Sequence, residues 1–387
     1  MICNQCTNYF VRVKFVSYKG DLKMPKKMNK HFNHHPFPDI INSELDDQHY
    51  TYINGLGFLP ETPQQKEQKQ LGIYYNILLF ALLLLFFLRV RVLSFVPIAN
   101  LLSILRSDIT INPMTSMITL SKTAYQLVNI LSYLFYMAVP SLVMILLLKK
   151  KTLVKKMFAI PNPKTTRYGV FILIGLAIVA QLFVLAFSHI LSFGGVVFSQ
   201  NYSKIPTEFV PFILYLLSIT IIPAFTEEFL FHGVILGSLR RFGDFVAIVV
   251  SSVCMTLTQT SAQDMLYVFI LSLGLGYLTI LSGSIVAPII SNFAIRSLFS
   301  FILLVEHNLF LQHGYLITGL LYLTFMLISI IAFCRFIRKN ADAFQISNQD
   351  TFLTNRTKIK CLLTNVIFWM LVILAFLEAL NDIQIIN

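Results

Sequence analysis

The sequence predicts an all-α, polytopic transmembrane helical bundle of about eight or nine helices. Of its 387 residues, 56% are hydrophobic and only 12% are charged, and the mean hydropathy is +0.72. A soluble globular domain does not need so much apolar surface. The apolar residues come in long runs that do not alternate with polar residues, and this pattern excludes the strands of a membrane β-barrel.

The predicted spans follow from the length of the apolar runs, because a helix needs about 20 residues to cross the hydrocarbon core. The candidate runs are residues 71–97, 124–148, 168–193, 209–238, 244–262, 265–282, 285–305, 315–335 and 363–385. The polar residues 1–70 are predicted to form a disordered cytoplasmic tail. The remainder divides into the first two spans with a basic loop (71–163), an intramembrane core (164–305) and C-terminal spans (306–387).

The N-terminal tail contains two clusters that loosely suggest a metal site. Cys3 and Cys6 form an isolated Cys-x-x-Cys pair, and His31, His34 and His35 lie close together. Neither cluster has the second pair of ligands that a zinc site needs. We expect a solvated tail there, and no metal or cofactor.

Three connections carry most of the basic residues, and they predict the orientation of the spans. The residues are Lys149, Lys150, Lys151, Lys155, Lys156, Lys164, Arg167, Arg240, Arg241, Arg335, Arg338, Lys339, Arg356, Lys358 and Lys360. These connections fall on one side if each run crosses once, and the positive-inside rule makes that side cytoplasmic. We therefore expect a multi-pass protein of the cell membrane with its N-terminus in the cytoplasm.

The net charge of +12 is explained by these loops. Nucleic-acid binding would need a compact basic domain, and the sequence has none. The expected partners are the lipid bilayer and a peptide or membrane protein.

Two adjacent glutamates, Glu227 and Glu228, lie inside an otherwise apolar stretch over residues 209–239. A carboxylate at bilayer depth costs several kcal/mol, about 3 on the more lenient scales, so the pair marks a candidate functional site. Pro223 and Thr226 predict a break and a fresh helix start just before the pair. The partial positive charge of a helix N-terminus would ease the burial of both carboxylates.

The candidate site extends to neighbouring spans. His232 follows Glu228 by four residues, so the two side chains share one face of a helix. Gln259 lies roughly 22 Å along the fifth span if that span is a continuous helix entered at Asp244. This depth places its amide well inside the membrane.

Asn292 and Arg296, in the seventh span, are also four residues apart. Arg296 lies roughly 18 Å along its helix, and an arginine at such depth must face the bundle interior and find a carboxylate. We predict that it pairs with Glu227 or Glu228. Spans four, five and seven would then gather their polar side chains into one shielded pocket.

These residues carry a resemblance to a known family. Over residues 165–305 the chain resembles the CAAX-prenyl-protease and bacteriocin-processing (CPBP, or Abi) family of intramembrane proteases, whose motifs are EExxxR, FxxxH and HxxxN. The corresponding segments here are Glu227-Glu228-Phe-Leu-Phe-His232, Met255-Thr-Leu-Thr-Gln259 and Asn292-Phe-Ala-Ile-Arg296. The glutamate pair is intact, whereas the arginine and both histidine positions are replaced.

The resemblance implies a glutamate-based endopeptidase. In the family a glutamate activates water, the polar side chains of the second and third motifs hold water or stabilise the oxyanion, and the arginine orients its glutamate. Gln259 and Asn292 keep the donors that oxyanion stabilisation needs. They cannot take up a proton at physiological pH as histidine can.

Several functions therefore stay open. One is an intramembrane peptidase that cuts a helical or lipidated peptide near the cytoplasmic leaflet. Another is a non-catalytic protein of the same fold, a pseudoenzyme that binds a peptide or partner protein, for example in bacteriocin self-immunity. A transport function is not supported, because no internal repeat is visible in the sequence. Glu228 and His232 have the helical spacing of metal ligands, but no third histidine or cysteine lies at a matching depth.

Overall fold

The computed structural model describes residues 50–53, 57–111, 117–149, 151–198, 205–307, 314–340 and 351–385. The tail residues singled out above, Cys3, Cys6, His31, His34 and His35, lie outside the described residues.

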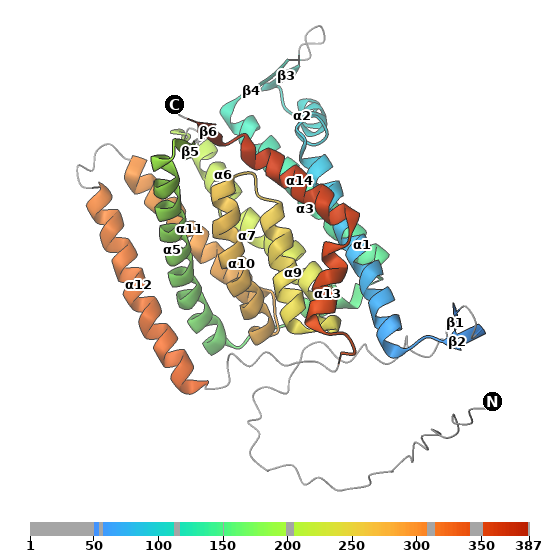
Figure 1. Ribbon diagram of the computed structural model, residues 1–387. Coiled ribbons are helices and arrows are strands. Elements are labelled where there is room, and N and C mark those ends of the chain that lie inside the picture. Colours follow the sequence, from blue (N-terminus) through green and yellow to red (C-terminus); the bar gives the residue numbers. More distant parts are fainter. Residues whose placement is uncertain are drawn as a thin grey trace, which may run out of the picture. The chain divides into compact units, whose positions relative to one another are not determined.

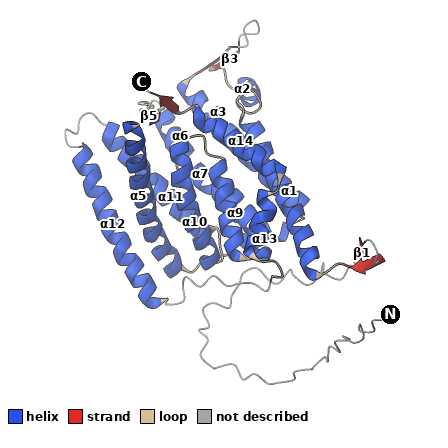
Figure 2. Ribbon diagram, in the orientation of Figure 1, coloured by secondary structure: helices blue, strands red, loops and turns tan. Residues whose placement is uncertain are grey.

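Helices dominate the described residues (Figures 1 and 2). They are α1 (Pro63–Arg89), α2 (Phe95–Ser103), α3 (Lys122–Leu147), α4 (Lys151–Met157), α5 (Pro163–Phe193), α6 (Phe209–Ile219), α7 (Ile221–Glu227), α8 (Leu236–Leu239), α9 (Asp244–Leu257), α10 (Ala262–Ser282), α11 (Val286–His307), α12 (Gly314–Lys339), α13 (Asn355–Leu363) and α14 (Val366–Leu380). A π-helix (Glu228–Ile235) joins α7 to α8, and a 3-10 turn (Arg240–Phe242) follows α8.

The strands form three antiparallel pairs outside the helices. These are β1 (Tyr50–Ile53) with β2 (Gly57–Pro60), β3 (Ile109–Ile111) with β4 (Ile118–Leu120), and β5 (Val196–Phe198) with β6 (Ile383–Ile385). The last pair ties the segment after α5 to the segment after α14.

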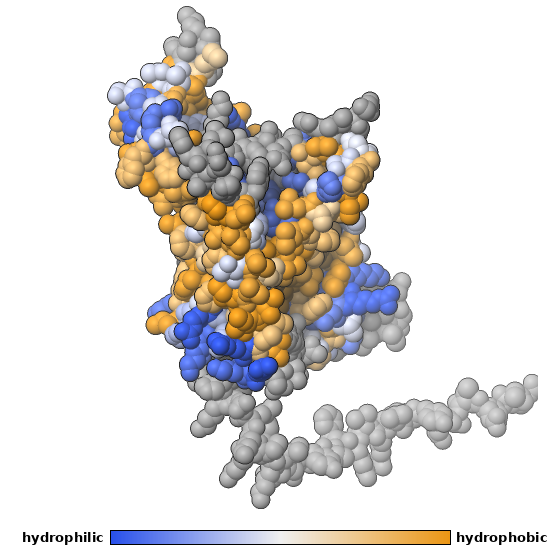
Figure 3. Space-filling view, turned by 90° about the vertical axis from the view of Figure 1, so that its left-hand side faces the viewer, coloured by the Kyte–Doolittle hydropathy of each residue, from blue (hydrophilic) through white to orange (hydrophobic). Residues whose placement is uncertain are grey.

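The described part of the chain has seven helices that are long and apolar enough to cross a membrane, or up to eight if α13 and α14 together make one span. Figure 3 shows the corresponding apolar belt, with hydrophilic residues gathered toward the two ends of the helices. The predicted fold class is therefore confirmed, and this is a multi-pass membrane protein.

One predicted span is shorter than expected. The run 244–262 forms α9, which ends at Leu257 after 14 residues, about 21 Å of helix. The hydroxyl of Thr256 bonds back to the Ser252 carbonyl and that of Thr258 to the Met255 carbonyl. Polar side chains that compete for backbone groups in this way favour helix ends.

The C-terminal run also differs from the prediction. Instead of one helix over residues 363–385, α13 and α14 meet at an angle of 67°. Asn365 lies at the bend and caps α14, its side chain accepting from the Ile367 N–H at 2.9 Å.

At the N-terminal side, the boundary predicted at residue 70 lies inside α1. This helix begins at Pro63 because Thr62 and Gln65 form a reciprocal capping box, and proline is well suited to a first helical position.

The fourth span is broken, although not where the sequence suggested. We expected the break beside Pro223 and Thr226, whereas α6 ends at Ile219 and the backbone of Thr220 (φ −114°, ψ −78°) interrupts the helix. A proline removes the hydrogen bond to the carbonyl four residues earlier and its ring clashes with that carbonyl. The break therefore falls at Ile219, and the glutamates lie well inside the next helical segment and not at its N-terminus.

The π-helix is enclosed by other helices. It contacts α3, α9 and α10, while α7 contacts α3 and α11. Gly233 allows a close approach, since a Cβ at this position would lie 2.8 Å from the Met157 sulfur at the end of α4. The segment that holds both glutamates is thus contacted by α3, α10 and α11, which come from distant parts of the sequence.

Candidate functional site

The two carboxylates occupy the junction between α7 and the π-helix. Glu227 is the last residue of α7 and Glu228 the first of the π-helix. Their exposed fractions are 7% and 0%. A buried carboxylate needs polar partners. A different side chain lies beside each of the four oxygens, and three of these contacts are hydrogen bonds.

Glu227 lies between a tyrosine and an arginine. Its Oε1 accepts from the hydroxyl of Tyr133 on α3 at 2.8 Å, and its Oε2 lies 2.5 Å from Nη2 of Arg296 on α11. The Arg296 Nη1 donates at 3.5 Å to the carbonyl of Ile219, the acceptor that Pro223 leaves without its helical partner. Arg296 thus neutralises the buried charge of Glu227 and also supplies a hydrogen-bond donor to the Ile219 carbonyl at the helix break.

Asn292 connects the two glutamates. Its Oδ1 accepts from Nε of Arg296 at 3.2 Å, and its Nδ2 donates to Glu228 Oε1 at 2.8 Å. Asn292 is 2% exposed, so both ends of its amide are used in the protein interior. Asn292 and Arg296 lie on one face of α11, as their four-residue spacing indicates, and their side chains are hydrogen-bonded to each other.

His232 faces the other oxygen of Glu228. Its Nδ1 lies 2.8 Å from Oε2, at an angle outside hydrogen-bond geometry. Its Nε2 lies 3.1 Å from the Ser272 carbonyl and 3.3 Å from the Ser272 hydroxyl. Both residues of the Glu228–His232 pair have side chains that are 0% exposed.

His232 Nε2 can either donate to the Ser272 carbonyl or accept from the Ser272 hydroxyl, so these contacts are compatible with both neutral tautomers of His232.

The site is therefore one continuous network across α3, α7, the π-helix, α10 and α11. It runs through Tyr133, Glu227, Arg296, Asn292, Glu228, His232 and Ser272. Within it, Arg296 balances the charge of Glu227, whereas Glu228 accepts from Asn292 and lies against His232.

Gln259 does not join this network. It lies beyond the end of α9, and its Nε2 donates to the Met255 carbonyl of its own helix at 3.1 Å. The depth predicted for Gln259 assumed a continuous span, and the early end of α9 removes that assumption. Its amide instead supplies a donor to one of the last carbonyls of a helix.

Two members of the network were not predicted from the sequence. Tyr133 and Ser272 lie in apolar runs that carry no motif. The only local signal is that Gly274 and Gly276 follow Ser272 and allow α10 to approach its neighbours closely. Among the described residues, no group of three or more His, Cys, Asp or Glu side chains is placed to hold a metal ion.

The comparisons with known proteins agree with the segment that holds most of the network. Residues 209–298, from the start of α6 into α11, match the family model described as type II CAAX prenyl endopeptidase Rce1-like. No curated protein and no solved structure matches the chain. Tyr133 lies outside the matched segment. The chain is an integral membrane protein, and its residues 209–298 are similar to the Rce1-like type II CAAX prenyl endopeptidases.

Proposed function

We propose that this protein is a non-catalytic relative of the intramembrane endopeptidases, and that it acts by binding a membrane-embedded peptide or partner protein. One observation carries the proposal: each of the four oxygens of Glu227 and Glu228 faces a side chain of the protein itself.

Peptide hydrolysis by a glutamate needs a water molecule within hydrogen-bond reach of a carboxylate that is free to take its proton. Glu227 is engaged by Tyr133 and by the ion pair with Arg296. Glu228 is buried completely between Asn292 and His232. Neither glutamate is arranged as a free general base.

The motif substitutions support the same conclusion. Gln259 and Asn292 stand where the resemblance implies histidines, and an amide cannot shuttle a proton. Gln259 also bonds to its own helix and not to the glutamates. Arg296 brings a positive charge to a position where the motif has a small polar residue, and this charge lies against Glu227.

We further propose that the N-terminus faces the cytoplasm of a cell-membrane protein. The start of α1, the turn after α8 and the end of α12 carry Lys66, Arg241 and Arg338. If the spans alternate in direction, these elements share one side of the bilayer. The positive-inside rule assigns that side to the cytoplasm.

The test compares the wild type with a variant that restores the motif residues. The variant carries His232→Arg, Gln259→His, Asn292→His and Arg296→Asn, and thermal unfolding establishes that it is folded. Both proteins are purified in detergent and given a prenylated peptide that ends in a Cys-aliphatic-aliphatic-X sequence. Cleavage by the restored variant but not by the wild type supports a non-catalytic role. Wild-type cleavage that is lost in Glu227→Gln overturns it.

A second function, glutamate-dependent hydrolysis, is favoured by one observation. The Arg296 side chain is 28% exposed, whereas that of Glu227 is 9% exposed. A rotation of the arginine toward its exposed side would release Oε2 of Glu227 and make room for water. In that case Arg296→Asn alone would raise the rate of cleavage above that of the wild type.

A further inference from the structure

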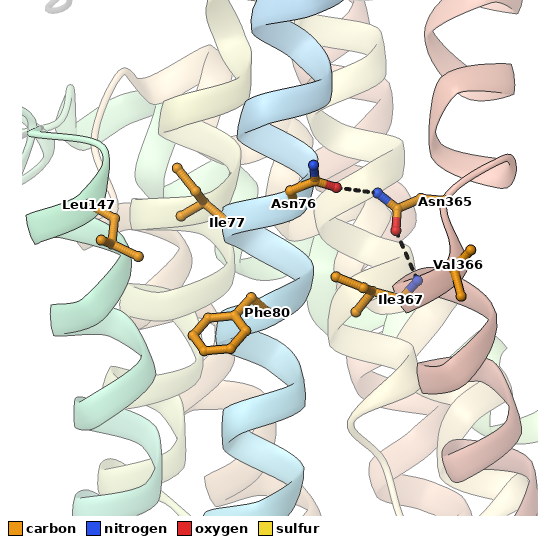
Figure 4. A pocket seen from close by; sticks show the side chains of 7 residues that line it. All are labelled: Asn76, Ile77, Phe80, Leu147, Asn365, Val366 and Ile367. Carbon is orange, nitrogen blue, oxygen red and sulfur yellow. Dashed lines mark hydrogen bonds between the residues drawn. The ribbon is translucent and has the colours of Figure 1, made fainter.

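A second candidate site lies away from the glutamates, on the outer face of the bundle. It is an open pocket of about 570 Å³, which we call the α1–α14 pocket. Its lining residues are Asn76, Ile77, Phe80, Leu147, Asn365, Val366 and Ile367. Figure 4 shows that they come from α1, the end of α3 and the start of α14.

The pocket holds two side-chain amides at an otherwise apolar surface. Asn365 Nδ2 donates to Asn76 Oδ1 at 2.6 Å (Figure 4). This leaves the Nδ2 group of Asn76 without a hydrogen-bond partner in the part of the chain that the structure describes. Asn76 is exposed in the middle of an apolar helix, and an unpaired amide facing hydrocarbon is costly. The amide therefore needs an acceptor from outside the protein.

The depth of Asn76 indicates which acceptor is present. Lys69, the last charged residue before the apolar run of α1, precedes it by seven residues, about 10 Å along the helix. The polar layer of each leaflet is roughly 5–8 Å thick. With Lys69 at the outer edge of the lipid headgroups, Asn76 lies about 2–5 Å below the polar layer, within side-chain reach of the glycerol esters. Their carbonyl oxygens are acceptors for its free N–H groups.

The chain on the headgroup side of the pocket is basic. Arg356 and Lys360 lie four residues apart on the exposed face of α13, and the exposed C-cap residue Thr364 follows at the same spacing and leads directly to Asn365. The α13 sequence contains no acidic residue. Trp369 is 51% exposed on α14, and tryptophan is typical of the membrane interface. Both features match a phospholipid whose headgroup is anionic.

We propose that the α1–α14 pocket binds one anionic phospholipid. Its acyl chain lies on Phe80 and Leu147, its ester carbonyls accept from Asn76, and its headgroup pairs with Lys360 and Arg356. This proposal is independent of whether the glutamate network is catalytic.

The experiment measures lipid retention by the full chain. The protein is purified in detergent, delipidated, and titrated with phosphatidylglycerol or phosphatidylcholine, with bound lipid counted by native mass spectrometry. We expect one phosphatidylglycerol per chain and a weaker phosphatidylcholine complex. The double variant R356Q/K360Q should lower phosphatidylglycerol affinity about ten-fold or more. Its matched control, R335Q/R338Q, removes two exposed charges from α12 and should leave the affinity unchanged.

The amide is tested separately with Asn76→Leu, which leaves the Asn365 cap of α14 intact. This variant should lower the affinity for both lipids, whereas Thr324→Leu on the exposed face of α12 should not. Equal affinities for the two lipids, or unchanged binding in Asn76→Leu, would overturn the proposal. Full competition by soluble glycerol phosphate, or retention of a co-purified peptide in place of lipid, would overturn it too.

Discussion

Arg296 on α11 reaches Glu227 at the end of α7, with 2.5 Å between Nη2 and Oε2. The same guanidinium donates to the Ile219 carbonyl on the far side of the helix break. A proline-induced break and a buried carboxylate therefore share one cation. This arrangement makes Arg296 the residue on which the local structure of the fourth span depends.

We predict that Arg296→Met lowers the free energy of unfolding by about 3 kcal/mol, because it leaves the Glu227 carboxylate buried without its partner. Combining it with Glu227→Gln should cost less than the sum of the two single changes, by about 1–3 kcal/mol. Denaturant unfolding in detergent measures each value. Strictly additive costs would show that the two side chains are not coupled.

A matched control for this ion pair is Lys122 with Glu208. These side chains lie 2.7 Å apart but are 63% and 58% exposed. When Lys122 and Glu208 are changed singly and together, the cost of the double change should differ from the sum of the two single costs by less than about 1 kcal/mol.

Glu228 should tolerate an amide better than an apolar side chain. In Glu228→Gln the new carbonyl can still accept from Asn292, and the new amide group can donate to His232 Nδ1, so we expect a loss of about 1 kcal/mol. Glu228→Leu leaves the Asn292 Nδ2 group without its acceptor and removes the polar contact with His232, and it should cost about 3 kcal/mol or more. Thermal unfolding of both variants checks the order. Equal losses would mean that the network does not hold Glu228 as described.

Two glycines should respond in opposite directions to alanine. A Cβ at Gly276 would lie 3.3 Å from carbon atoms of His232, Ile248 and Leu236, whereas a Cβ at Gly319 has no neighbour within 4 Å. Gly319→Ala should stabilise α12 by up to about 1 kcal/mol through helix propensity. Gly276→Ala must displace its neighbours and should cost about 1 kcal/mol. Stabilisation by both changes would show that α10 and the π-helix are loosely packed.

Lys358 should be far more sensitive than its neighbour on the same helix. It is 1% exposed, and its Nζ donates to the Phe242 carbonyl at 2.6 Å and to the Thr351 hydroxyl at 2.8 Å. Lys358→Met leaves that carbonyl unpaired and should cost about 2–3 kcal/mol. The control, Lys360→Met in delipidated protein, changes an exposed side chain and should cost less than about 0.5 kcal/mol. Similar losses would mean that burial of Lys358 does not matter.

The sequence was most informative where a contact lies within one helix. The four-residue spacings of Glu228 with His232 and of Asn292 with Arg296 predicted that each pair shares a helix face, and in the structure the two side chains of each pair lie close together. An arginine inside the membrane needs a carboxylate partner, and this requirement predicted that Arg296 contacts Glu227 or Glu228. Which glutamate would receive Arg296 depends on the rotation of α7 against α11, and no local pattern encodes that angle.

The remaining features of the site depend on tertiary structure or on backbone geometry. Tyr133 and Ser272 reach the network from helices without a motif, so only the packing reveals them. Gln259 was misplaced because its depth was counted along a helix that ends two residues earlier. The position of the break was recoverable in principle, since proline acts on the carbonyl four residues before it.

The contribution of Tyr133 has a consequence for protein engineering. Residues 209–298 coincide with the family match, yet one oxygen of Glu227 depends on a phenol encoded 94 positions upstream. A chimera that contains only residues 209–298 would include Glu227 and Glu228 but would lack the hydroxyl donor of Tyr133. The smallest portable unit therefore includes α3, and a chimera that omits it should fail to assemble even if every motif residue is kept.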